Sequence, residues 1–157
     1  MPDRPPATKA QHPWVALGFD FGTRRIGVAA GDSLTNGARP IGVVAAYAGT
    51  PDWPPLERFI RDWAPRTLIV GVPYNMDGSE GSLTAAAIQF AEELKQRFGL
   101  PVIPVDERLS SREAESILRS QRASGARLRR VRHDDVDSAA ACVLLEQWLR
   151  GRTQTNE

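Results

Sequence analysis

The chain has 157 residues, of which 41% are hydrophobic, and its formal net charge at pH 7 is +1. This length can bury one compact core but is too short for two full domains. The single cysteine, Cys142, excludes a disulfide framework within the chain, and no segment approaches the ~18 consecutive apolar residues of a membrane span. We therefore expect a soluble, cytoplasmic protein with one domain over residues 14–150, a disordered leader over 1–13 and a disordered tail over 151–157.

The first part of the chain has the pattern of a β-meander. Over residues 14–21, large apolar side chains alternate with small residues and Asp20, which predicts a strand that ends on a carboxylate. The run "RIGVAAG" follows after a turn at residues 22–24, so the two strands should form an antiparallel hairpin. A third run, "ARPIGVVAAY", is expected to continue the meander. The small residues Gly18 and Gly27 should let neighbouring backbone pack closely.

Helices and strands alternate in the rest of the chain. We expect helices in "PPLERFIRDWAP", over residues 83–98 ended by Gly99, after a capping box of Ser110 and Glu113, and over Asp134–Arg150. The runs "RTLIVGVP" and "LPVIPVDERLSS" are expected to be strands, and a Gly-rich loop, "YNMDGSEGS", follows the first of them. A meander followed by alternating helices and strands predicts an α/β fold, in which helices pack on a mixed sheet.

The segment between Arg119 and Arg132 is basic and interrupted by Gly125. We expect it to form a mobile arm or loop. Its density of positive charge, in a chain whose charges are otherwise mixed, favours phosphate binding over a merely solvated surface. The arginines that would contact phosphates are Arg122, Arg127, Arg129, Arg130 and Arg132.

Three carboxylates stand where side chains can converge at one edge of the sheet. Asp20 and Glu107 follow apolar strands, and Asp137 lies at the start of a helix with an apolar face. Taken singly, Asp20 could bind turn amides, Glu107 could lie on the surface, and Asp137 could interact with a helix dipole. Held together, they would repel one another unless a divalent cation neutralised them, and an oxygen-only set suits Mg²⁺ or Mn²⁺. The chain's few Cys and His residues exclude a tetrahedral zinc site.

Five blocks of the sequence resemble, in order and spacing, the YqgF/RuvX family of RNase H-like proteins: "LGFDFGTRRIGVAAGD", "ARPIG", "IVGVPYNMDGSEGSLTAAA", "VDERLSSREAE" and "VDSAAACVLLEQW". The resemblance spans about residues 14–150. It implies an RNase H-like mixed sheet of five strands, three in an antiparallel meander and two parallel. It also carries the family's three acidic positions onto Asp20, Glu107 and Asp137. The sequence departs from many relatives at Asp135, where they have a basic residue.

The resemblance implies a metal-dependent nuclease. With two ions ~3.5–4 Å apart, Asp20 would bridge the metals and Glu107 and Asp137 would flank them, so that no Ser or Cys nucleophile is needed. Further candidates for nucleic-acid contact lie in the turn after Asp20 and in the Gly-rich loop, although each could instead be a turn or surface residue. These candidates are Thr23, Arg24, Arg25 and Asn75.

Several functions remain open. The family has been described both as pre-16S rRNA processing nucleases and as Holliday junction resolvases. A sugar-kinase or actin-like nucleotide binder would need a second lobe, and a non-catalytic nucleic-acid-binding module would gain nothing from carboxylates that face phosphates. Resolving a junction normally requires a two-fold dimer, which the sequence does not suggest. We therefore expect a monomer that cleaves single-stranded RNA in 5′-end processing of pre-16S rRNA, with junction DNA as the alternative substrate.

Overall fold

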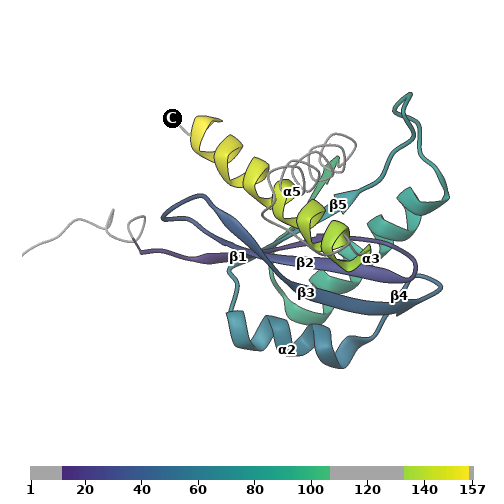
Figure 1. Cartoon of the computed structure of the whole chain (residues 1–157), viewed down its shortest axis with the longest axis horizontal. Helices are drawn as coiled ribbons and strands as arrows, with labels where there is room; N and C mark the ends of the chain where they lie inside the picture. The colour runs from purple at the N-terminus through teal and green to yellow at the C-terminus, as the bar shows by residue number, and fades with distance from the viewer. Residues whose placement is uncertain (1–11, 107–132, 156–157) are drawn as a thin grey trace, which may run out of the picture.

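The computed structural model describes residues 12–106 and 133–155, and of these it describes 133–137 and 153–155 by their backbone alone. Six strands form one sheet in the order β4-β3-β2-β1-β5-β6, and the three helices of the described part cover its two faces (Figure 1). The predicted α/β fold with a mixed sheet is confirmed, but the sheet has six strands rather than five.

The predicted N-terminal meander is present, with antiparallel pairing throughout. One extra residue on its third strand, Ile41, creates a β-bulge beside Gly42. Gly42 has a φ of 154°, and a Cβ atom there would lie 2.9 Å from the Cζ atom of Phe59, so the bulge requires glycine. The strands of the meander are β1 (Val15–Asp20), β2 (Arg25–Asp32) and β3 (Ala38–Tyr47).

The sixth strand, which the sequence did not predict, is β4 (Thr50–Pro51), and it pairs antiparallel with the end of β3. Between these strands, Ala48 and Gly49 have φ values of 51° and 86°, as in the tight hairpin turns that match the twist of a sheet. Alanine rarely adopts a positive φ. The dipeptide Ala48-Gly49 is therefore a weak sequence signal for a hairpin.

The second half supplies the parallel strands and the helices of one face. Two helices, α2 (Trp53–Trp63) and α3 (Ser82–Phe98), alternate with β5 (Thr67–Val72) and β6 (Val102–Asp106). β5 pairs in parallel with β1, and β6 with β5. α3 ends at Gly99, as predicted, with a φ of 65°. The main core lies between these helices and the sheet, and in it the rings of Phe19 and Phe90 meet edge to face at 5.8 Å.

The opposite face of the sheet is covered by α5 (His133–Thr155) (Figure 1). A Cβ atom on Gly18 would lie 3.1 Å from the Cβ atom of Leu145 and 3.2 Å from the carbonyl oxygen of Ala141. Gly18 therefore allows the backbone of α5 to pack closely on β1, as expected for a glycine at this position. Within the described residues, none of the helices combines the length and the hydropathy needed to cross a bilayer.

α5 extends further than predicted. The sequence indicated an end at Arg150 and a disordered tail over 151–157, whereas the helix continues to Thr155. The physical reason is tertiary: the guanidinium of Arg152 lies 4.8 Å from the ring centroid of Trp14, a cation–π contact between the last turns of the helix and the start of the sheet.

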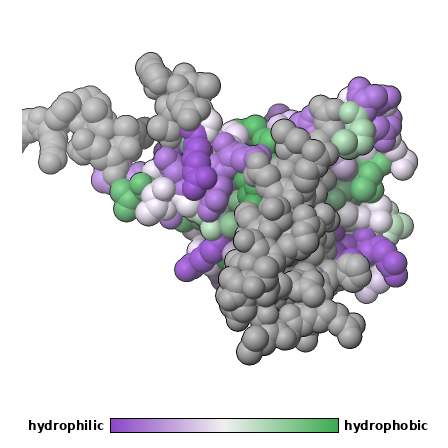
Figure 2. All heavy atoms as spheres, turned by 45° about the horizontal axis from the view of Figure 1, so that its top comes forward, coloured by the Kyte–Doolittle hydropathy of each residue, from purple (hydrophilic) through white to green (hydrophobic). Residues whose placement is uncertain are grey.

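Hydrophilic and hydrophobic residues are mixed on the coloured part of the face shown in Figure 2, where the hydrophobic ones form small, separate patches. The large hydrophobic residues exposed among the described residues are Leu34, Tyr47, Met76 and Ile88.

Candidate functional site

Asp20 is the last residue of β1, near the middle of the sheet. It pairs with Gly27 on β2 and with Gly71 on β5, so the two positions directly opposite it carry no side chain. The alternation along β1 places Asp20 on the same face as Ala16, whose side chain belongs to the core under α5. The carboxylate is half-buried. This is the predicted arrangement of a charge at the end of an otherwise buried strand.

The start of α5 lies at the same edge of the sheet. The ring of Trp148 lies 6.2 Å from that of Trp14, whereas Ala141 lies over Gly18, further along β1. The helix therefore runs antiparallel to β1, and Asp137, one turn before Ala141, belongs to the part that approaches the end of the strand. The side chain of Asp137 is outside the described residues.

The third predicted carboxylate, Glu107, follows the last residue of β6 and also lies outside the described residues. β6 ends at Asp106, which pairs with Val72 at the end of β5. Because β1, β5 and β6 are parallel, their carboxyl ends share one edge of the sheet. The ends of β1 and β6 and the start of α5 thus approach one edge of the sheet. The described residues alone contain no group of three His, Cys, Asp or Glu residues able to hold a metal. The Mg²⁺ or Mn²⁺ site stays a prediction.

The turn after Asp20 carries three predicted nucleic-acid contacts. Thr23 and Arg24 are exposed and Arg25 is half-buried. The hairpin of β3 and β4 holds this turn through two backbone hydrogen bonds: the N–H of Ala46 donates to the carbonyl oxygen of Arg24 (2.9 Å), and that of Gly49 to the carbonyl oxygen of Thr23 (3.1 Å). The turn is thus tied to the sheet, and its side chains are presented to solvent beside the strand end.

Asn75 has a structural role in the protruding loop between β5 and α3 (Figure 1). Its side-chain amide donates to the Oγ atom of Ser79 (3.0 Å), and its backbone N–H donates to the carbonyl oxygen of Ser79 (2.9 Å). The turn-shaping interpretation of Asn75 is therefore supported. A contact with substrate is still a prediction. The arginines of the basic arm, with Ser110 and Glu113, lie within residues 107–132, outside the described part.

Sequence reasoning missed a hollow of about 280 Å³ at the same edge as Asp20, between this loop and β6. The signal that could have found it is the position of its residues at and beyond the carboxyl ends of β5 and β6, where ligands of open α/β sheets bind. The residues that line it are Val72, Tyr74, Gly78, Pro104, Val105 and Asp106.

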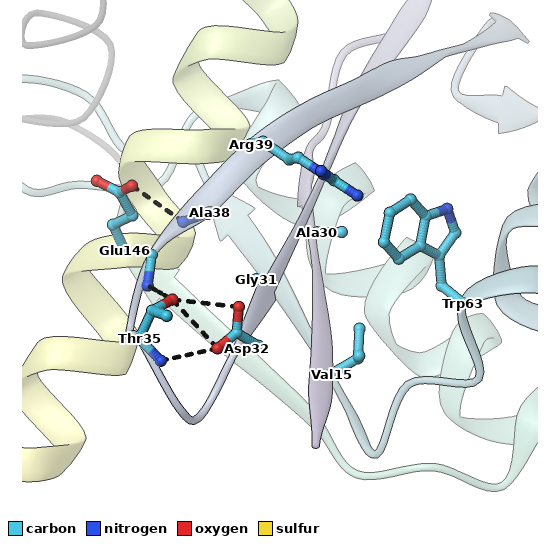
Figure 3. Close-up of a pocket in the computed structure, with 10 residues that line it drawn as sticks. Val15, Ala30, Gly31, Asp32, Thr35, Ala38, Arg39, Trp63 and Glu146 are labelled. Carbon is cyan, nitrogen blue, oxygen red and sulfur yellow. Dashed lines mark hydrogen bonds between the residues drawn. The ribbon is translucent and has the colours of Figure 1, made fainter. Parts of the chain in front are cut away.

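A larger hollow of about 430 Å³ lies at the opposite edge, where β1 begins and β2 ends (Figure 3). Its carboxylates are engaged in the fold. An oxygen of Asp32 accepts hydrogen bonds from the backbone N–H of Leu34 (3.0 Å) and of Thr35 (2.8 Å). Glu146 accepts one from the backbone N–H of Ala38 (3.0 Å). The carboxylates of this larger hollow are therefore part of the hydrogen bonding that holds the turn and the start of β3.

Three side chains on α5, spaced four residues apart, attach the helix to the backbone of β3. Ser138 donates to the carbonyl oxygen of Gly42 (3.1 Å), Cys142 to that of Ala38 (3.1 Å), and Glu146 accepts from the N–H of Ala38. Burial, with a smaller contribution from Glu146, raises the pKa of the Cys142 thiol to about 11. Cys142 is therefore a packing residue rather than a reactive thiol, as the sequence predicts.

Known proteins share both the sequence and the fold. The chain matches the family model described as "RuvX: Holliday junction resolvase" over residues 14–151. A protein of Legionella pneumophila is 49% identical over 136 residues, covering 87% of this chain and 95% of that protein. One of Coxiella burnetii is 48% identical over 143 residues, covering 91% and 96%. Each is named "Putative pre-16S rRNA nuclease".

Two solved structures show the fold at low identity. Thermus thermophilus RuvC in complex with a Holliday junction substrate has a TM-score of 0.53 at 16% identity, covering 90% of this chain and 97% of that one. The fowlpox virus resolvase in complex with Holliday junction DNA has a TM-score of 0.55 at 13% identity, covering 87% and 97%. These likenesses confirm the RNase H-like architecture. The family match and the two bacterial relatives show that the chain belongs to the RuvX family of nucleases, hydrolases that cleave phosphodiester bonds.

Proposed function

We propose that this protein cleaves single-stranded RNA at the unprocessed 5′ end of 16S ribosomal RNA, with Mg²⁺ or Mn²⁺ as its cofactor. The observation that carries the proposal is the position of Asp20, held at a sheet edge that the start of α5 also approaches. The names of the relatives from L. pneumophila and C. burnetii support the substrate. Flexible single strands can bend into such an edge more readily than a duplex can.

The residues fit a divalent cation in chemistry, and the proposal is supported by the described backbone, in which the end of β1 and the start of α5 approach one edge of the sheet. Asp20, Glu107 and Asp137 would supply oxygen ligands only, which Mg²⁺ and Mn²⁺ prefer. When bound, such ions activate a water molecule and stabilise the leaving oxygen. The protein's own contribution is rigidity. Hydrogen-bonded strands on both sides of β1 fix the backbone of Asp20, so the carboxylate is positioned before substrate arrives.

Basic side chains would hold the phosphates on either side of the cleaved bond. Arg24 lies on the turn after Asp20, which is tied to the β3–β4 hairpin, and Arg25 begins β2 directly after it. The arm would add contacts further along the strand. A variant that neutralises several of its arginines should weaken binding to all RNA sequences and flatten the salt dependence by a slope of ~0.7 per lost phosphate contact. An unchanged slope would exclude the arm from the interface. The arginines to replace are Arg127, Arg129, Arg130 and Arg132.

Holliday junction cleavage is the second candidate, because the family model carries that description and the structural neighbours were solved with junction DNA. A resolvase must make paired, symmetric cuts, which normally requires two active sites related by a two-fold axis. We propose instead a monomer with one site. Light scattering at the assay concentration distinguishes the two assemblies.

The deciding experiment compares the two substrates side by side. Purified protein and its Asp20→Asn variant are incubated, at one salt concentration in Mg²⁺ and in Mn²⁺, with a 5′-extended 16S rRNA fragment and with a four-way DNA junction. We expect the wild type to cut the RNA and the variant to be inactive. Depletion in cells should leave 16S rRNA with unprocessed 5′ ends. Symmetric junction cutting, with normally matured rRNA ends after depletion, would reject the RNA assignment.

A further inference from the structure

We propose that Tyr47, at the tip of the β3–β4 hairpin, is a platform on which an unpaired base of the substrate stacks while the strand is held at Asp20. The inference rests on the proposed function and specifies which part of the molecule selects single strands. Tyr47 is 76% exposed, an unusual state for a large aromatic side chain. Single-stranded nucleic acids are commonly held by stacking their bases on aromatic rings.

Tyr47 projects from the same face of the sheet as Asp20. Along β3, Val44 and Ala46 are buried in the core shared with α2 and α3, so the alternation turns Tyr47 to the opposite face. On β1, Phe19 belongs to that same core, and Asp20 therefore also faces the opposite side. The ring and the carboxylate thus belong to one surface.

The distance between the two residues suits a short segment of single strand. Asp20 pairs with Gly27, and Gly27 pairs with Val43, so these three residues form one row across the sheet. Tyr47 is two strands away from Asp20 and four residues beyond this row. Ideal strand spacing and rise convert that offset to roughly 16 Å, which a few nucleotides can span.

The exposed part of the path between the two residues carries a cation that suits a sugar-phosphate backbone. Gly27 is buried and Val43 is half-buried, and beyond this pair the half-buried Arg25 pairs with the exposed Ala45. By the same alternation, Arg25 and Ala45 face the side of Asp20 and Tyr47. A guanidinium at this place provides a phosphate contact between the stacked base and the cleaved bond.

The platform is rigidly coupled to the site. The hydrogen bonds from Ala46 to Arg24 and from Gly49 to Thr23 join the hairpin to the turn that begins just after Asp20. A tyrosine has only two side-chain torsions to restrict, and its backbone here is already fixed, so a stacked base costs little conformational entropy. A duplex keeps its bases stacked on one another and gains nothing from the ring.

The test compares Tyr47→Ala with Tyr47→Phe, which keeps the ring, and with Leu34→Ala. Leu34 is a matched control, because it is 75% exposed but lies in the loop between β2 and β3, at the opposite edge. Binding is measured in Ca²⁺, to prevent cleavage, for a single-stranded RNA and for a duplex of the same sequence. We expect Tyr47→Ala to lose at least about fivefold in affinity for the single strand and none for the duplex. The two other variants should stay within about twofold of wild type.

An abasic scan of the RNA places the contact. In the wild type, one abasic position at a fixed offset from the cleaved bond should raise KM and leave kcat unchanged, and Tyr47→Ala should be insensitive to that substitution. If the wild type binds and cleaves the single strand and Tyr47→Ala does so equally well, the platform is rejected and the proposed function stands. If the wild type does not bind single-stranded RNA, both fail.

Discussion

Two aspartates, Asp20 and Asp32, are the last residues of neighbouring strands and lie at opposite edges of the sheet. Asp32, at the end of β2, accepts hydrogen bonds from the backbone N–H groups of Leu34 and Thr35, so its partners come from its own turn. Asp20, at the end of β1, lies between two glycines, at an edge approached by elements more than 80 residues further along the chain. The hydrogen bonds of Asp32 stabilise its own turn, and the approach of remote elements to the edge that holds Asp20 makes Asp20 the candidate for chemistry.

The strongest test of this contrast is Asp20→Asn. Replacing the carboxylate by an amide of the same shape should lower nuclease activity on the order of 100-fold or more, because the proposed metal ligand, worth several kcal/mol in the transition state, would be lost. The melting temperature without metal should be unchanged or higher, since any repulsion from the proposed neighbours Glu107 and Asp137 would be relieved. Activity within twofold of wild type, or a clear fall in melting temperature, would instead assign Asp20 to the turn.

Gly18→Ala tests whether the placement of α5 matters to the Asp20 edge. The new methyl group would meet the Cβ atom of Leu145 and the carbonyl oxygen of Ala141 at 3.1–3.2 Å, so the helix must shift. We expect unfolding in urea to show a loss of about 1–2 kcal/mol and activity per folded molecule to fall. Gly151→Ala, on the same helix with no atom within 4 Å of the new Cβ, should keep full activity and be no less stable. Equal activity in the two variants would uncouple α5 from the site.

Asp32→Ala gives the converse of the first experiment. Loss of the acceptor for two backbone N–H groups should lower the free energy of unfolding by about 1 kcal/mol, as the loss of a capping side chain does. Nuclease activity should remain within twofold of wild type, because the turn lies at the far edge of the sheet. A variant as stable as wild type but impaired in cleavage would move the functional site to the hollow beside Asp32.

The smallest expected effect concerns Cys142. Its pKa is raised from 9.0 to about 11 in the folded protein, so folding favours the neutral thiol. This contribution to stability is fully present below pH 9 and is lost as the pH rises towards 11. Compared with Cys142→Ser, which keeps a donor for Ala38, the wild type should lose less than about 1 kcal/mol between pH 7.5 and pH 9.5. Rapid alkylation of the native thiol at pH 8 would contradict the raised pKa.

The sequence predicted correctly those elements that depend on neighbouring residues in the chain. The alternation along residues 14–21 located Asp20 on its strand and face, and Gly99 marked the end of α3 because its left-handed conformation suits glycine. The sixth strand was missed because its turn places Ala48, a residue that rarely has a positive φ, where glycine or asparagine is usual.

Features that depend on tertiary contacts escaped prediction. The extension of α5 to Thr155 is accompanied by the contact of Arg152 with Trp14, from the other end of the chain. The exposure of Tyr47 and its link to the turn after Asp20 depend on hairpin register and on backbone hydrogen bonds, which leave no mark in the sequence. The grouping of the three carboxylates follows from their places at strand ends and at a helix start, and is implied again by the family resemblance; it stays a prediction.

The bonds that tie α5 to β3 also bear on the order of folding. They join residues 96, 104 and 108 positions apart in the chain, whereas the β1–β2 hairpin closes over a short turn. Contacts of such separation form late, because a long stretch of chain must first be brought together. A folding intermediate would therefore contain the meander, with Asp20, before α5 packs on the sheet and brings Asp137 to the edge. Recovery of cleavage after dilution from denaturant should accordingly lag behind the recovery of strand structure.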